Sequence, residues 1–300
     1  MTFRRLASAF TILAGLSGLA QPAAALTFNF TTKPGDTLST EQRAAFQAAA
    51  DIWSATLSDA ITVNLAIGFT SLGANVLGQT TPSVFSVPKN AVQTLLGFDA
   101  TSQTDIQAVS SLYSSTQSQL VLTSAELKAI GGFSSATSDG AIEFSNSFSF
   151  STSRNGDGSI AAGTYDLIGI AAHEIGHLLG FVSSIDGGNV QTLLDQFRYG
   201  ASGVRSVVSG AAAYFSIDNG ATNLAGFSDG VSDQASHWAL GTNAVMMPEV
   251  GAGQVQNVTA LDLLALDALG YDVVAVPEPW SIGLLTTGIV FAAGTRRRRA

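Results

Sequence analysis

The segment that decides the fold is residues 164–180, which read TYDLIGIAAHEIGHLLG. Its apolar residues surround most of the circumference of a helix, so the pattern predicts a buried helix over 164–179. His173 and His177 are four residues apart and therefore share one helical face, where both imidazoles can bind one metal ion. Glu174 would lie beside that ion without binding it. Burying these polar side chains in an apolar helix is costly unless they are paired or bind a metal.

A catalytic zinc ion needs a third protein ligand and a free position for water. Ser183, six residues after the second histidine, is a poor zinc ligand. Asp186 could reach the ion only if the chain turned back sharply. The next glutamate after Glu174 is Glu249, which follows a proline in a loop-like segment. The sequence therefore gives little support to these three candidates.

The remaining candidate is His237, the only other histidine in the chain. The alternative for His237 is an ordinary core or surface histidine. We predict that His173, His177 and His237 bind one Zn²⁺ and that Glu174 is the general base. The metal would polarise a carbonyl and activate a water molecule, whose proton Glu174 would accept.

The pattern His173-Glu174-x-x-His177-x-x-Gly180 resembles the active-site helix of the metzincins, in which the glycine lets the chain leave the helix in a left-handed turn. Met246-Met247-Pro248 is similar to the metzincin Met-turn, which implies that Met246 packs beneath the metal without binding it. His237 lies 60 residues after His177 and nine before Met246. This order resembles the leishmanolysin branch, where the third histidine follows a long insertion.

The chain departs from these families in two respects. Ser183 stands where many metzincins have their third ligand, and the disulfides of the leishmanolysin branch are absent because the chain has no cysteine. The run also resembles secreted bacterial metalloproteases that carry PEP-CTERM tails. Together these resemblances imply a zinc metalloendopeptidase that acts on proteins or peptides.

The expected fold is α+β and metzincin-like. An upper lobe would hold a twisted sheet, a backing helix over 40–57 and the active-site helix, and an irregular lower lobe over 181–275 would supply His237 and the Met-turn. An extended substrate would pair with an edge strand of the sheet, for which we select residues 141–150. Other expected elements are strands over 26–31 and 61–69 and helices over 90–96, 104–113, 124–130 and 262–271.

The two ends of the chain resemble export signals. Residues 1–25 have a basic start, an apolar middle and small residues at the end, as in a secretory signal peptide. Residues 276–300 contain Pro277-Glu278-Pro279, an apolar run and an arginine cluster, and resemble a PEP-CTERM sorting signal of Gram-negative bacteria. The resemblance implies that an exosortase removes the tail, leaving no stable membrane anchor; the alternative is a permanent anchor. The unit in between, 26–275, would be secreted and extracellular or matrix-associated.

The composition excludes several classes of function. The net charge is −9, and only 12% of the residues are charged, which argues against nucleic acid or anionic membranes as partners. The absence of cysteine excludes a thiol nucleophile, thiolate metal ligands and a disulfide framework. An alternative to the peptidase is an extracellular matrix or surface binding protein with a structural or inactive zinc site. A third possibility is a zinc hydrolase of substrates other than peptides.

Three further patterns in the sequence are less specific. Asp195 and Arg198 could form an ion pair across one turn, with a structural role. Residues 155–158 and 218–220 offer oxygen ligands for Ca²⁺, but such segments are more often plain turns. Candidate donors to a reaction oxyanion are three tyrosines: Tyr199, Tyr214 and Tyr271.

Overall fold

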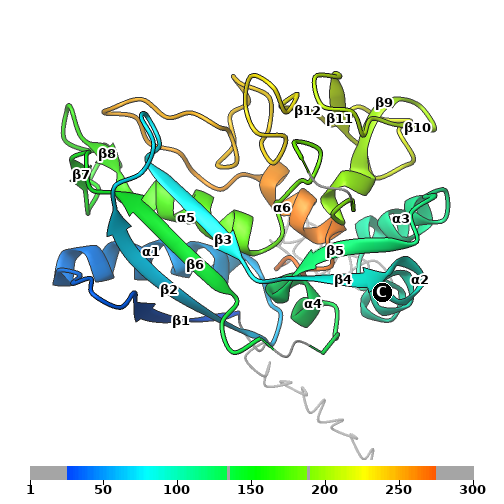
Figure 1. Cartoon of the computed structure of the whole chain (residues 1–300), viewed down its shortest axis with the longest axis horizontal. Coiled ribbons are helices and arrows are strands. Elements are labelled where there is room, and N and C mark those ends of the chain that lie inside the picture. Colours follow the sequence, from blue (N-terminus) through cyan, green and yellow to red (C-terminus); the bar gives the residue numbers. More distant parts are fainter. Residues whose placement is uncertain (1–25, 134–135, 188–189, 275–300) are drawn as a thin grey trace, which may run out of the picture.

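The computed structural model describes residues 26–133, 136–187 and 190–274. Helices and strands are mixed in this part of the chain, so the predicted α+β class is confirmed. The predicted signal peptide, 1–25, and sorting tail, 276–300, lie outside the described residues. None of the described helices has the length and apolar character needed to span a membrane. The α-helices described are α1 (Thr40–Thr56), α2 (Lys89–Asp99), α3 (Gln103–Leu112), α4 (Ser124–Ala129), α5 (Leu167–Leu178) and α6 (Ala260–Ala268), shown in Figure 1.

All six helices were expected from the sequence, and their ends differ from the predicted ends by at most three residues. The shifts have local causes. α6 begins before Asp262 because Thr259 and Asp262 form a capping box, in which each side chain accepts the other residue's backbone amide. α5 begins later than expected because the two residues before it form a short strand.

The main sheet has four strands in the order β1-β2-β6-β3. β1 (Thr27–Thr32), β2 (Thr62–Thr70) and β6 (Gly140–Ser145) are parallel, whereas β3 (Gly78–Pro82) is antiparallel to β6. Two pairs of strands lie outside this sheet: β4 (Val84–Pro88) with β5 (Gln119–Thr123), and β7 (Phe150–Ser151) with β8 (Tyr165–Asp166).

The expectation that residues 141–150 form the edge of the sheet is wrong. β6 covers the first half of that range and lies between β2 and β3, so the edge strand beside α5 is β3. β3 reads GQTTP, which has no apolar alternation and ends in proline, and it therefore gives no strand pattern in the sequence. Its pairing with β6, which is distant in the chain, decides its conformation.

α1 and α5 pack against each other and cover one face of the sheet (Figure 1). Ser39 caps the first turn of α1. Trp53 of α1 is fully buried, and its Nε1 donates to the Ala172 carbonyl of α5 at 3.0 Å. The Phe46 ring stacks on Phe144 of β6 with 5.1 Å between centroids. These contacts fix the position of α5 relative to the sheet.

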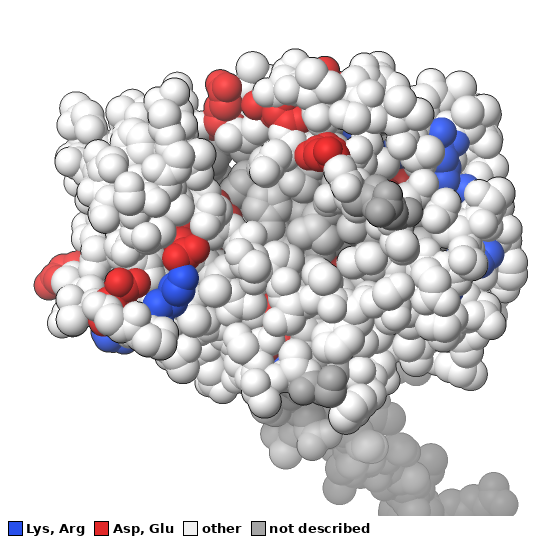
Figure 2. All heavy atoms as spheres, viewed as in Figure 1, with Lys and Arg blue, Asp and Glu red and all other residues white. Residues whose placement is uncertain are grey.

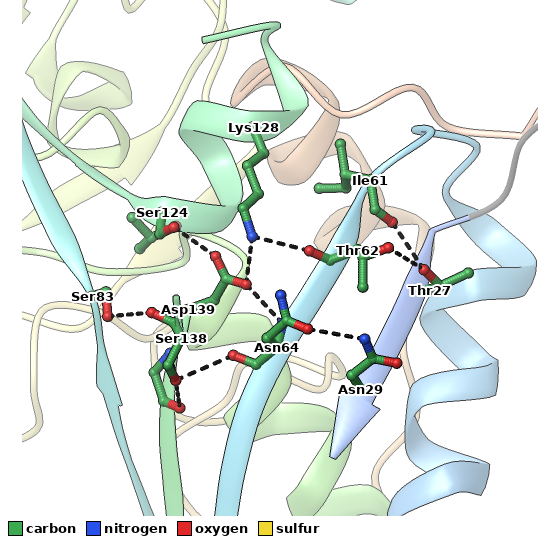
Figure 3. A network of polar contacts seen from close by, with 12 residues as sticks. Thr27, Asn29, Ile61, Thr62, Asn64, Ser83, Ser124, Lys128, Ser138 and Asp139 are labelled. Atoms are coloured by element: carbon green, nitrogen blue, oxygen red, sulfur yellow. Dashed lines mark hydrogen bonds and ion pairs between the residues drawn. The ribbon is translucent and has the colours of Figure 1, made fainter. Parts of the chain in front are cut away.

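A buried polar network joins α4 to the sheet (Figure 3). The Lys128 ammonium donates to Asp139 Oδ2 at 2.7 Å and to the Thr62 carbonyl at 3.0 Å. The fully buried Asp139 carboxylate also accepts from the backbone amide of Asn64 at 2.7 Å and from the Ser124 hydroxyl at 2.6 Å. The network therefore connects α4, β2 and the start of β6 through one carboxylate.

The second region of the chain, from residue 181 onward, is mostly irregular, as predicted. It also contains a four-stranded sheet that the sequence did not reveal, because strands of two to four residues carry too short a pattern. Aromatic rings fill its core, with Trp238 between Phe181 and Phe227. The sheet order is β10-β9-β11-β12, with β9 (Arg198–Ala201), β10 (Val204–Arg205), β11 (Ala213–Phe215) and β12 (Ala225–Phe227). A short 3₁₀ helix, Leu194–Phe197, precedes β9.

Candidate metal centre

The two histidines of α5 and His237 of the irregular region meet at one point. Their Nε2 atoms lie 3.0 Å (His173 to His177), 3.2 Å (His177 to His237) and 3.2 Å (His173 to His237) apart. Two nitrogens that bind one zinc ion tetrahedrally at about 2.05 Å are separated by about 3.3 Å. All three side chains are buried. The triangle therefore has nearly the dimensions of three ligands around a single zinc ion.

The other nitrogen of each ring shows which tautomer is present. His173 Nδ1 lies 2.7 Å from the Val245 carbonyl, and His177 Nδ1 lies 2.6 Å from the Phe181 carbonyl. His237 Nδ1 is 3.2 Å from the carbonyl of residue 234. A carbonyl can only accept, so each Nδ1 carries the proton of its hydrogen bond, and in the neutral form of each ring Nε2 would offer its lone pair to the shared point.

Burial favours the same neutral state. Loss of solvation is the largest cause that lowers the pKa of His177 well below its usual value, and the repulsion that protonated rings at His173 and His237 would exert adds to it. The pKa of His237 falls to about 3, chiefly for the same reason. Three converging lone pairs repel one another unless a cation lies between them. The donor set therefore fits a zinc ion held by three neutral imidazoles.

The other candidates for the third ligand have different partners. Ser183 Oγ donates to Asp195 at 2.6 Å, and the Asp186 carboxylate accepts the Ala235 amide at 2.9 Å. Glu249 is exposed. Among the described residues, the three histidines form the only group of three or more His, Cys, Asp or Glu side chains with metal-binding spacing. Of the residues considered from the sequence, the structure thus brings His237 to the α5 histidines.

Gly180 directs the chain out of α5. Its φ is +120°, in the region that favours glycine, and a Cβ at this position would lie 2.3 Å from Glu126 Cγ. The turn places the next residue, Phe181, so that its carbonyl accepts from His177. The glycine expected from the motif therefore also orients one of the three histidines.

The Met246 turn lies against α5. Met246 is fully buried, and its sulfur is so close to α5 that a Cβ at Gly176 would be 2.4 Å from it. Asp262 organises this turn: its carboxylate accepts the backbone amides of Val245, at 3.1 Å, and Met246, at 3.3 Å. The sequence identifies Asp262 only as part of the last helix. Its spacing from Thr259 predicts a capping box but not these contacts across the fold.

Glu174 lies beside the histidines under strand β3. Thr80 Oγ1 is 2.7 Å from Glu174 Oε2 and 2.9 Å from the Glu174 backbone carbonyl. Burial raises the pKa of Glu174 above its usual value, against the lowering effects of the electrostatic interaction with His173 and of the Thr80 hydrogen bond. The sequence does not indicate Thr80, because its strand has no recognisable pattern and its distance along the chain from Glu174 matches no motif.

The site opens into a groove of about 1710 Å³. Figure 2 shows the hollow on this face of the molecule. β3 and the turn before it line this groove, together with residues from segments 230–241 and 247–256. The described lining contains no Lys or Arg side chain, and its carboxylates belong to Glu174, Asp186, Asp233 and Glu249.

The three tyrosines considered as oxyanion donors do not line this groove. Tyr199 and Tyr271 are buried in the core, and the Tyr214 hydroxyl donates to the Gly220 carbonyl at 2.7 Å. That expectation is wrong, because these side chains point into the second region and the core. The tyrosine that lines the groove is Tyr165, which the sequence did not single out.

The expected pairing of Asp195 with Arg198 is also wrong. Asp195 accepts hydrogen bonds from residues 183, 184 and 192, whereas the Arg198 guanidinium donates to the carbonyls of Ser228 and Ala235 at 2.9 Å each. Both residues thus hold loops in place. In the possible calcium segments, the carboxylates of Asp157 and Asp218 accept hydrogen bonds from nearby Ser and Thr residues, as in plain turns.

Comparisons with known proteins do not assign the chain to a family. A scan against protein-family models found no match, and a search of the curated proteins found none either.

Proposed function

We propose that this chain is a secreted, metzincin-like zinc endopeptidase. The observation that carries the proposal is the convergence of three histidine Nε2 atoms at 3.0–3.2 Å beside the buried Glu174, at the floor of an open groove. His173, His177 and His237 would hold the ion, and the groove would leave room for a water molecule and a substrate. A bound zinc ion lowers the pKa of a water ligand and polarises a carbonyl.

The chain's own groups would supply the proton transfers and the positioning. Glu174 would act first as a general base, which accepts the proton of the attacking water, and then as a general acid, which gives that proton to the leaving amine. The free edge of β3 lies along the groove, so an extended peptide can add to it as a further strand. A groove of about 1710 Å³ has room for an internal segment of a substrate chain.

The signal peptide and the sorting signal that the sequence predicts are the basis for the proposed location of the protein. A chain with a signal peptide and a sorting signal would be exported, processed by an exosortase-type enzyme and left outside the cell or on its surface. Exposed and matrix proteins are then the substrates within reach.

The test is cleavage of casein and gelatin by the purified chain, with a matched panel of small esters. Zinc-loaded protein should cleave the proteins, a chelator should stop cleavage, and zinc added back should restore it. Cleavage of esters alone would make the chain a different zinc hydrolase. A zinc-loaded protein that hydrolyses nothing would contradict the proposal and favour a binding protein with a structural zinc site.

A further inference from the structure

We propose that edge strand β3 positions the general base, with Thr80 anchoring one oxygen of Glu174 and Gly78 leaving space for the other. The inference rests on the proposed function, since it assigns positioning residues to the same reaction. It depends on contacts between β3 and α5.

Thr80 and Gly78 are on the same face of β3, because alternate residues of a strand point to the same side. This face is turned toward α5, since Thr80 Oγ1 reaches Glu174. Gln79, between them, points to the other face, where its amide donates to Glu143 at 2.9 Å. The register of β3 on β6, which pairs Thr80 with Ile142, fixes this arrangement.

The Thr80 hydroxyl holds Glu174 at two atoms. It is 2.7 Å from the carboxylate Oε2 and 2.9 Å from the backbone carbonyl, both of which can only accept. The hydroxyl proton therefore lies between the side chain and the backbone of the same residue. This contact favours one rotamer of Glu174 and leaves Oε1 without a hydrogen-bond partner among the described residues.

The Glu174 carboxylate occupies the space that a side chain at position 78 would need. Its φ is not positive, so the backbone does not require a glycine. A Cβ built on Gly78 would meet Oε1 at 2.7 Å and Cδ and Cγ at 3.2 Å, and all three atoms belong to Glu174. Glycine weakens a strand, and here it leaves space for Oε1 beside the groove that both residues line. β3 thus holds Oε2 and leaves Oε1 able to exchange a proton.

The experiment compares Thr80→Val, which keeps the shape but loses the hydroxyl, with Thr80→Ser, which keeps the hydroxyl, and with Gly78→Ala. We expect Thr80→Val and Gly78→Ala to lower kcat for a peptide substrate about 10- to 100-fold, a part of the 10²- to 10⁴-fold that a general base supplies. KM and zinc affinity, the latter measured by competition with a chelator, should stay within about threefold. Thr80→Ser should retain most of kcat, and Thr62→Val on the far side of the sheet is the matched control.

A double-mutant cycle separates positioning from general damage to the fold. In a Glu174→Gln background, Thr80→Val should cause no further loss, because the group that it positions is already gone. Wild-type kcat in a folded Thr80→Val variant, or an equal loss of zinc affinity and kcat, would overturn the inference while the proposed function stands. If Thr80→Val does not fold, full kcat in Gly78→Ala overturns it. Failure of the wild-type chain to cleave any peptide would instead remove the proposed function.

Discussion

His237 is the residue on which the zinc site depends most, because it is the only contribution of the second region to the histidine triangle. Its ring contacts the carbonyl of residue 234. The next residue, Ala235, donates its backbone amide to Asp186 and accepts at its carbonyl from Arg198. The loop that carries this histidine is therefore fixed by buried polar contacts. A ligand on a fixed loop loses little entropy when it binds a metal, and such preorganisation favours tight binding.

Replacing His237 with alanine should lower zinc affinity at least about 100-fold, because even outer-shell partners of metal ligands are worth 10- to 100-fold. Competition with a chromophoric chelator measures this directly. His237→Asp, which replaces the imidazole with a carboxylate that can also bind zinc, should retain more affinity than His237→Ala. Undiminished zinc binding by His237→Ala, at an unchanged melting temperature of the metal-free protein, would show that this residue is not a ligand.

Gly180 should be hard to replace. Alanine there would have to adopt a φ of +120° and would place its methyl against Glu126, so we expect a loss of about 1–3 kcal/mol of stability. Zinc affinity should also fall, since the following carbonyl orients His177. Gly131 is the control, because its φ is +71° but no atom lies within 4 Å of its Cβ position. Urea unfolding gives the free energy of unfolding of both variants: Gly131→Ala introduces backbone strain alone, and Gly180→Ala introduces strain and a contact with Glu126. Equal losses of stability would contradict a contribution from that contact.

At the scale of elements, α4 and the sheet are joined through Asp139. Removing one partner of a buried ion pair leaves an uncompensated charge, so Asp139→Ala should cost about 3–5 kcal/mol in urea unfolding. Asp157, which accepts hydrogen bonds in an exposed turn, is the matched control, and its replacement should cost less than about 1 kcal/mol. Similar losses in the two variants would mean that the network in Figure 3 contributes little to stability.

Elements with their own pattern could be predicted from the sequence, and elements defined by distant pairing could not. α1 has a cap at Ser39 and an apolar stripe, and α5 has a continuous apolar circumference, so both were located closely. β3 has neither, and the edge of the sheet was assigned to β6 instead. The same limit applies to the site: His173, Glu174 and His177 share one helix and one spacing, whereas the contacts of Thr80 and Asp262 exist only after folding.

At the scale of the whole molecule, buried carboxylates set a pH dependence. Burial, and to a lesser degree the nearby Asp272 carboxylate, raises the pKa of Asp59 to about 7. Burial also raises the pKa of Asp99 and of Asp267 to about 6. In the unfolded chain aspartate ionises near pH 4. The folded state therefore binds more protons than the unfolded state between about pH 4 and 7, and these groups lose their stabilising effect as the pH rises through that window.

Asp59→Asn removes one of these groups and keeps an oxygen that can accept the Asp272 amide. Relative to wild type, the variant should gain about 1–2 kcal/mol of stability between pH 5 and 8, a figure already reduced for solvent screening. The difference in stability between the two proteins reports on Asp59, because both contain the same three histidines. Melting temperatures measured with chelator across this range check the prediction, and a pH-independent difference would contradict it.

The central claim is that Glu174 acts on a water molecule at a metal held by three histidines, and casein cleavage by zinc-loaded Glu174→Gln tests it most directly. The variant should bind one zinc ion as wild type does and lose at least about 100-fold in cleavage rate. Glu41→Gln, an exposed position on α1, should cleave like wild type. A zinc-loaded Glu174→Gln variant that cleaves casein at the wild-type rate would contradict the claim.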